Sequence, residues 1–308
     1  MKRRTLLVAA TALALAALPA RGQAMPRVGF LVAGDAEPAW TLFRKEMAAP
    51  GYVEGRTIAY EFRQADADSG KLDLFAAELV RLKVDVLVPI LSPAIVAARK
   101  ATSAIPIVFF GAAPDIDGIT NVARPEGNLT GMFRPSATLA GKGLQLFHSI
   151  KPGMTRFAAL LNERDPFHVP LQRDIQAAAD AEKVELLPIL VTAPGTLAQH
   201  FESMVADQVT GVIVQPSLGL ATAAELALKV RMPAISFRRE FAEAGGFFSY
   251  GADQPAGSVD RVLKGAAPAS LPVQQATRME LVVNQKTART LGIMLPPMFL
   301  AQADEVIE

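Results

Sequence analysis

Residues 72–93, LDLFAAELVRLKVDVLVPILSP, contain a helix pattern followed directly by a strand pattern. In the first part, apolar side chains recur at the spacing of one helix face: Leu72, Phe75, Leu79 and Leu82. The run DVLVPI that follows, residues 85–90, has the length and the β-branched content of a buried strand. Strands that alternate with helices indicate an α/β fold with a parallel sheet and right-handed crossovers.

Further runs of the same kind lie on both sides of this strand. Those of the first half are VGFLVA (28–33), TIAYEF (57–62) and PIVFFG (106–111). Those of the second half are RFAALL (156–161), VELLPIL (184–190), GVIVQP (211–216) and PAISF (233–237). Each run of the second half begins at nearly the same distance after its counterpart, 128 residues for the first pair (28 and 156) and 126 for the third (85 and 211). The pattern therefore predicts two similar halves.

A break between the halves favours two lobes over one large doubly wound sheet. Residues 121–136 carry several turn-forming residues: Pro125, Gly127, Gly131 and Pro135. We expect two Rossmann-like lobes with parallel sheets, residues 25–134 and 135–250, and a ligand cleft between them. The pattern changes after Tyr250, and residues 251–308 are expected to cross back and complete the first lobe.

The first 24 residues have the features of a signal peptide. A basic start (Lys2, Arg3, Arg4) precedes the apolar run Leu6–Leu18, which is shorter than the ~20 residues of a membrane-spanning helix. Small residues end this segment near Ala24, where a signal peptidase would cleave. The twin arginines leave both Sec and twin-arginine export open. We expect a periplasmic protein, and without any cysteine it would carry no lipid anchor.

Composition excludes several classes of function. The whole chain has a formal net charge of +1, and removing four basic residues with the leader leaves 27 basic against 30 acidic residues. This balance gives no reason to expect binding to nucleic acid. The absence of cysteine excludes disulfides and thiolate metal sites, and His148, His168 and His200 do not have metal-ligand spacing.

No catalytic motif follows a predicted strand. The sequence contains no nucleophile elbow, Walker A loop or dinucleotide-binding glycine motif in that position. We therefore predict no catalytic residue, no metal and no cofactor. An exported α/β enzyme acting through Asp115, Glu163 or His168 is the less favoured alternative. Asp165, close to His168, is interpreted as part of a surface turn.

The carboxyl ends of parallel strands, where helix N-termini offer free N–H groups, select the candidate ligand-binding residues. In the first lobe they are Gly34, Trp40, Ser92, Pro93 and Gly111, and in the second lobe Asn162, Ser217, Arg238 and Tyr250. Several of them have a structural alternative. Ser92-Pro93 is also a typical helix cap, Trp40 also suits a core, and Arg238 with Arg239 also suits a solvated pair.

Several stretches resemble the ABC transporter substrate-binding protein family that includes tryptophan and tyrosine uptake proteins. They are GYVEGRTIAYEFR (51–63), ELVRLKVDVLV (78–88), ARPEGNLTG (123–131), FAEAGGFFSYG (241–251) and, most specifically, the C-terminal residues 271–308. The resemblance implies a periplasmic binding protein fold of the first type, with two lobes, three crossings and a ligand between the lobes. It also implies an ABC permease of the inner membrane as partner and suits a monomer.

The resemblance assigns positions within the cleft and shows two departures. Ser92-Pro93-Ala94, Gly111, Asn162 and Tyr250-Gly251 match family segments that face the ligand. Where the family has Gly-Asp-Pro, this chain has Gly111-Ala112-Ala113-Pro114, so the role of the aspartate would pass to Asp115 or be lost. Residues 250–264 form a stretch that is shorter, by about two helical turns, than the corresponding segment of the family.

The resulting expectation is an exported solute-binding component of an ABC importer. It would close its lobes on a small polar or aromatic ligand, amino acids included. The alternative function is that of a ligand sensor for a membrane signalling partner, and the sequence does not distinguish a sensor from an importer component.

Overall fold

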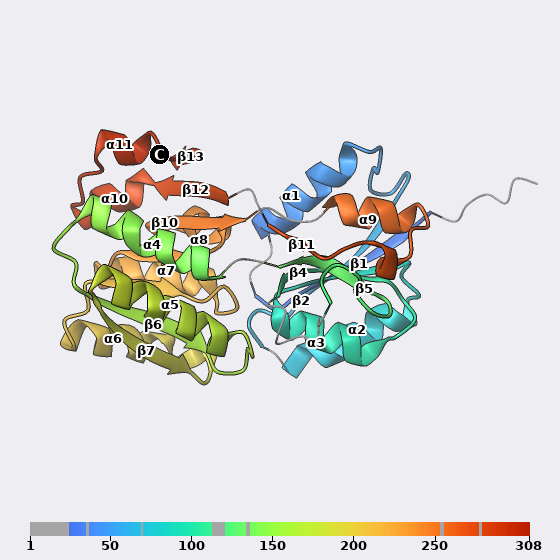
Figure 1. Cartoon of the computed structure of the whole chain (residues 1–308), viewed down its shortest axis with the longest axis horizontal. Helices are drawn as coiled ribbons and strands as arrows, with labels where there is room; N and C mark the ends of the chain where they lie inside the picture. Colours follow the sequence, from blue (N-terminus) through green and yellow to red (C-terminus); the bar gives the residue numbers. More distant parts are fainter. Residues whose placement is uncertain are drawn as a thin grey trace, which may run out of the picture.

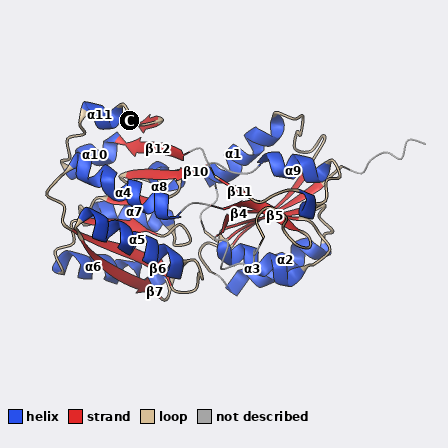
Figure 2. Cartoon of the chain, viewed as in Figure 1, coloured by secondary structure: helices blue, strands red, loops and turns tan. Residues whose placement is uncertain are grey.

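The computed structural model describes residues 25–34, 37–68, 70–112, 121–133, 136–252, 256–276 and 279–308. Figure 1 shows two lobes side by side, and Figure 2 shows helices on both faces of each sheet. The predicted two-lobed α/β architecture is therefore confirmed. The predicted leader, residues 1–24, and Asp115 lie outside the described residues. Among the described residues no helix combines the length and apolar character needed to cross a membrane.

The first lobe is built on a six-stranded sheet with the order β11-β5-β4-β3-β1-β2, whose neighbouring strands are all parallel. Its strands are β1 (Arg27–Val32), β2 (Ala59–Gln64), β3 (Val86–Ile90), β4 (Ile107–Ala112), β5 (Leu129–Phe133) and β11 (Gln274–Gln275). Its helices are α1 (Glu37–Ala48), α2 (Gly70–Arg81), α3 (Ser92–Ala101), α9 (Ala256–Leu263) and the short 3-10 helix η2 (Pro268–Ser270).

The sequence pattern of residues 72–93 accounts for the centre of this lobe. Leu72 and Leu79 of α2 are buried, while Phe75 is half-buried. Helix α2 packs beside α3, and every residue of β3 is buried. A strand buried on both faces needs a continuous apolar run, as found here.

The second lobe is built on a seven-stranded sheet with the order β13-β12-β10-β9-β8-β6-β7. Its strands are β6 (Arg156–Asn162), β7 (Glu185–Val191), β8 (Gly211–Val214), β9 (Ala234–Ser236), β10 (Phe248–Ala252), β12 (Met279–Asn284) and β13 (Glu305–Ile307). Its helices are α4 (Ser136–Ile150), α5 (His168–Glu182), α6 (Leu197–Ala206), α7 (Leu220–Lys229), α8 (Arg239–Glu243), α10 (Gln285–Leu291), α11 (Pro297–Leu300) and the 3-10 helix η1 (Pro194–Thr196).

The chain passes between the lobes three times, from β5 to α4, from β10 to α9 and from β11 to β12. The middle passage brings residues 256–276 to the first lobe, where Val259 and Leu271 join its core. The last passage differs from the expectation for 251–308. Strand β12 pairs antiparallel with β10, and Leu281 and Phe299 belong to the core of the second lobe.

Candidate ligand-binding site between the lobes

The carboxyl ends of the strands of both lobes meet around one small cavity. The first lobe contributes Leu91 and Gly111, and the second contributes Leu139, Asp165, Phe167, Pro216, Ser217 and Phe237. The cavity has a free volume of about 10 Å³, which is room for about one water molecule. The lobes are therefore closed upon each other at this position.

Direct contacts between the lobes surround the cavity. A Cβ atom placed on Gly34 would lie 3.2 Å from the carbonyl oxygen of Pro216 and 3.7 Å from that of Leu218. Helix α1 of the first lobe also contacts α8 of the second. Ala67 closes a second small cavity against Asn162 and its neighbours. The predicted cleft is thus present in a closed form, with Gly34 on one of its contacting edges.

The wall formed by the first lobe has an unusual backbone. Leu91, between β3 and α3, has a φ angle of 72°, and Gly111, with a φ angle of 91°, packs against it. With a ψ angle of 153°, Leu91 lies in a backbone region that is nearly confined to glycine. Such a conformation costs roughly 1–3 kcal/mol, and strained residues of this kind cluster at active sites and ligand clamps. Leu91 rather than Ser92 occupies the N-cap of α3, and no side-chain cap forms there. The Ser92 hydroxyl is instead buried (1% exposed for the residue) without a hydrogen-bond partner among the described residues.

The wall formed by the second lobe is a buried network of polar side chains. The Asn162 backbone N–H donates to Gln215 Oε1 at 2.9 Å, and Asn162 Nδ2 donates to the carbonyl oxygen of Ser217 at 3.2 Å and to its Oγ at 3.3 Å. Gln215 Nε2 donates to Asp165 Oδ2 at 2.8 Å. The network fixes the loop after β6 against the loop after β8, so Asp165 and Ser217 hold defined positions on the cavity wall.

Asp165 is not the exposed turn residue that its sequence context indicated. It does make the turn, since its Oδ1 accepts the N–H of Phe167 at 2.9 Å, but Phe167 and Gln215 cover it and the residue is only 2% exposed. Burial raises the pKa of Asp165 above its ordinary value of 3.8, although hydrogen bonds from Ser217, Phe167 and Gln215 oppose this shift. The local sequence carries no signal for this burial, because a turn aspartate has the same pattern whether it is exposed or covered.

Arg238 and Arg239 have different environments, so they do not form the solvated pair that was one alternative. Arg238 is 3% exposed, and its Nη2 donates to Glu240 Oε1. Its Nε and Nη1 have no hydrogen-bond partner in the described part of the chain. Arg238 follows the cavity-lining Phe237 directly in the chain, just after β9, and is not itself among the described residues that line the cavity.

Arg239 connects three elements of the second lobe. Its Nε, Nη1 and Nη2 lie 2.9 Å from Glu243, 3.0 Å from Glu280 and 2.7 Å from Glu305. Desolvation by burial lowers the pKa of Arg239, but the hydrogen bonds that Arg239 donates to Glu243 and Glu305, together with the charge of Glu280, outweigh it and raise the pKa. Arg239 thereby joins α8 to β12 and β13 and stabilises the C-terminal strands.

Two predicted aromatic residues lie away from the cavity. Trp40 is 7% exposed, and its ring centroid is 5.1 Å from Phe30, 5.0 Å from Tyr60 and 5.1 Å from Phe62. This favours the core interpretation of Trp40. Tyr250, half-buried in β10, packs with the core of the second lobe, and burial raises its pKa.

The structure therefore groups the predicted residues unevenly. Gly111 and Ser217 line the cavity, Asn162 lines its neighbour, and Ser92 with Pro93 forms the buried start of α3. Six other lining residues were not predicted from the sequence, namely Leu91, Leu139, Asp165, Phe167, Pro216 and Phe237. The described part of the chain contains no group of three or more acidic or histidine side chains that could hold a metal ion.

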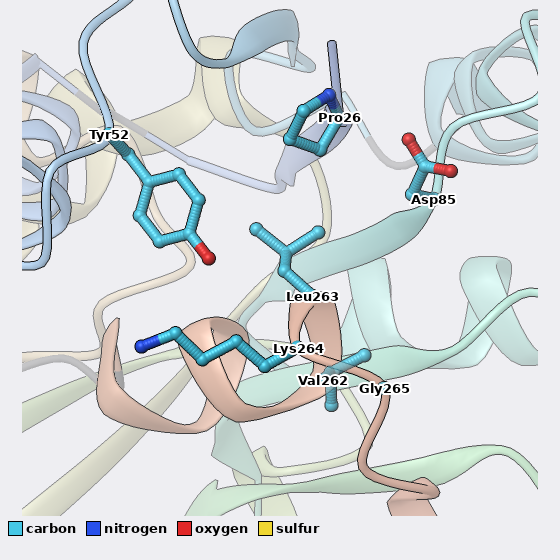
Figure 3. A pocket seen from close by; sticks show the side chains of 7 residues that line it. All are labelled: Pro26, Tyr52, Asp85, Val262, Leu263, Lys264 and Gly265. Carbon is cyan, nitrogen blue, oxygen red and sulfur yellow. The ribbon is translucent and has the colours of Figure 1, made fainter. Parts of the chain in front are cut away.

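A larger pocket of about 700 Å³ lies in the first lobe at the opposite ends of its strands, lined by Pro26, Tyr52, Asp85 and residues 262–265 (Figure 3). Figure 3 shows Tyr52 and Lys264 on one side and Asp85 on the other. Lys264 Nζ lies 2.9 Å from Asp260 Oδ1, and burial together with a hydrogen bond to Asp260 raises the pKa of Tyr52. Because this pocket lies before β1 and β3, it is separate from the cavity between the lobes.

The sequence profile described as ABC transporter substrate binding protein matches residues 32–307, and the chain belongs to this family. A tyrosine-binding protein of Clostridioides difficile is 22% identical over 265 residues, which cover 82% of this chain and 75% of that relative.

Two solved structures share the fold. A conserved domain protein from Vibrio cholerae has a TM-score of 0.80 at 23% identity, covering 92% of this chain and 100% of the other. A Streptococcus domain in complex with L-Trp has a TM-score of 0.80 at 22% identity, with the same coverage. These likenesses identify the two-lobed fold.

Proposed function

We propose that this protein is the exported solute-binding component of an ABC importer and closes its lobes on a small amphipathic solute of amino-acid size. The observation that carries the proposal is the cavity that both lobes share, closed by the contact of Gly34 with Pro216. Because this closed cavity has room for only about one water molecule, a solute must enter while the lobes are apart. Motion of one lobe relative to the other would supply that opening.

The chemistry of the walls supports a solute with a polar head and an apolar body. Phe167, Phe237 and Leu139 offer apolar surface, whereas Asp165 and Ser217 offer polar atoms. Arg238 Nε and Nη1, which have no hydrogen-bond partner among the described residues, suit a carboxylate, because a carboxylate accepts charge-assisted hydrogen bonds from arginine. One relative is named a tyrosine-binding protein and another was solved with L-Trp, which makes aromatic amino acids the first ligands to examine.

The proposal includes the setting of the protein. The leader would direct it to the periplasm, where it would diffuse as a monomer without an anchor and deliver its solute to a permease. Binding would involve no chemical step. We expect no cofactor to take part.

Calorimetry and thermal unfolding of the chain without residues 1–24 test this proposal. The panel is L-tryptophan, L-tyrosine, L-phenylalanine, aromatic acids without an amino group, and nucleosides. We expect at least one amino acid to bind and to raise the unfolding temperature in proportion to the logarithm of its concentration. A panel that neither releases heat nor raises the unfolding temperature would contradict the proposal.

A further inference from the structure

Asp165 is a buried carboxylate, 2% exposed, that forms no ion pair with a lysine or arginine among the described residues. The described residues include no lysine or arginine in an ion pair with it, and the one cationic influence on it comes from His168. The Nδ1 atom of His168 contacts the backbone oxygen of Asp165, at 2.9 Å, rather than its carboxylate. Buried carboxylates are normally paired or coordinated, so the position calls for an explanation.

The hydrogen bonds of Asp165 leave part of its capacity free. Its oxygens accept from the Phe167 N–H at 2.9 Å, from Gln215 Nε2 at 2.8 Å and from the Ser217 side chain. A carboxylate offers about four acceptor positions, so roughly one position remains. Asp165 lines the cavity between the lobes, where that position is available to a ligand.

The charged residues nearest to Asp165 in the described sequence are not among those that line the cavity. Glu163 and Arg164 belong to the same turn and are exposed, and His168 begins α5 on the other side of the turn. The remaining lining residues are uncharged, from Leu91 and Gly111 in the first lobe to Pro216 and Phe237 in the second. Among the described residues that line the cavity, Asp165 is therefore the one with an ionisable side chain.

We propose that Asp165 determines specificity by supplying the counter-charge for a cationic nitrogen of the ligand. The site then selects ammonium-bearing amphipathic solutes over the same compounds without the amino group. This inference rests on the proposed function and names the substrate class of that site. An ammonium at Asp165 makes a desolvated ion pair when the lobes close, and a ligand without it leaves the carboxylate buried and unpaired.

Calorimetry with two probes tests the assignment. L-tryptophan carries the ammonium, and indole-3-propionic acid is the same molecule without it. The variants are Asp165→Asn, which is nearly isosteric with the protonated acid, and Glu163→Gln as a matched exposed control from the same turn. The wild type and Glu163→Gln should bind L-tryptophan roughly 30-fold or more tightly than indole-3-propionic acid. Asp165→Asn should lose this preference, because its affinity for L-tryptophan falls while that for indole-3-propionic acid stays within about threefold.

Three outcomes contradict different statements. Unchanged L-tryptophan affinity in a folded Asp165→Asn variant would show that Asp165 acts as a neutral structural acid, and would overturn the inference. Equal binding of both probes by the wild type would also overturn it, yet leave the proposed function standing. If neither probe binds and no other member of the panel binds either, the proposed function is contradicted, and this inference with it.

A pH series on the wild type keeps the inference testable if Asp165→Asn does not fold. Protonation of Asp165 removes the counter-charge, so affinity for L-tryptophan should fall as the pH is lowered from neutral to about 4.5, while the ligand ammonium stays charged. An affinity that is constant over this range would overturn the inference.

Discussion

Gly34 of the first lobe contacts the backbone of Pro216 in the second lobe across the cleft. A Cβ at Gly34 would lie 3.2 Å from the Pro216 carbonyl oxygen, a distance tighter than most such contacts in proteins. The backbones of the two lobes therefore lie so close in the closed form that even a Cβ atom at Gly34 would be tightly packed. Gly34 was predicted as a cleft residue from its place after the first strand, and this contact gives it a physical role in closure.

Replacing Gly34 by valine should hold the lobes apart. Two added methyl groups cannot be placed against the backbone oxygens of Pro216 and Leu218 without separating the lobes. We expect the affinity for L-tryptophan, measured by calorimetry, to fall roughly tenfold or more, because the closed state becomes less populated. Gly153→Val is the control, since a Cβ at Gly153 would meet nothing within 4 Å. Equal affinities for both variants would contradict the role of Gly34 in closure.

Arg238 should contribute to stability and to carboxylate binding separately. Arg238→Met removes one member of a buried ion pair with Glu240 and should lower the free energy of unfolding by about 3–5 kcal/mol. Adding Glu240→Gln removes the charge left behind and should restore much of that stability, without restoring the affinity for L-tryptophan.

Urea unfolding and calorimetry separate the two effects. Tryptamine, which lacks the carboxylate, should bind the double variant and the wild type with similar affinity. If the double variant instead bound L-tryptophan as tightly as the wild type, Arg238 would be a structural residue only.

Asp165 should make the unliganded protein relatively more stable in acid. Its pKa is raised in the folded protein, so the folded state binds more protons than the unfolded state at pH values between the ordinary 3.8 and the raised pKa. Its contribution to the free energy of unfolding therefore increases as the pH falls through the raised pKa, and the gain is complete below 3.8.

Urea unfolding of the wild type and Asp165→Asn at a series of pH values measures this contribution. The difference in the free energy of unfolding should shift in favour of the wild type as the pH is lowered. Parallel curves for the two proteins would show that the Asp165 pKa is not raised.

Trp40, the single tryptophan of the chain, should report on the core of the first lobe and not on the ligand. The fluorescence emission of Trp40 should be nearly the same with and without bound L-tyrosine, because its ring is enclosed by Phe30, Tyr60 and Phe62. Trp40→Phe should keep the affinity within about twofold, whereas Trp40→Ala should lower the free energy of unfolding by about 3–5 kcal/mol. Loss of ligand binding in a folded Trp40→Phe variant would place Trp40 in the site.

The repeated strand and helix patterns were sufficient to predict the fold. The run predicted at 85–90 corresponds to β3, and the run predicted at 156–161 corresponds to β6. Buried parallel strands require continuous apolar runs, so their positions are readable from composition. The sequence did not predict to which lobe β12 belongs, because an apolar run at 279–283 suits either sheet. Only its pairing with β10 decides between them.

The candidate site was less predictable than the fold. Position after a strand correctly brought Gly111 and Ser217 to the cavity, because the carboxyl ends of parallel strands share one edge. Position after a strand did not distinguish Trp40, a core residue, from a residue that lines the cavity, because the place of Trp40 depends on packing within the lobe. Asp165 was missed because an aspartate in a turn has the same local pattern whether solvent or another loop covers it.

Small-angle X-ray scattering of the chain without residues 1–24, with and without saturating L-tryptophan, tests most directly whether the lobes close on a solute. The account predicts a larger radius of gyration without the solute, and a scattering profile that matches the closed structure when the solute is bound. Identical profiles in a sample that calorimetry shows to be saturated, both of them different from the closed structure, would contradict closure as the mechanism.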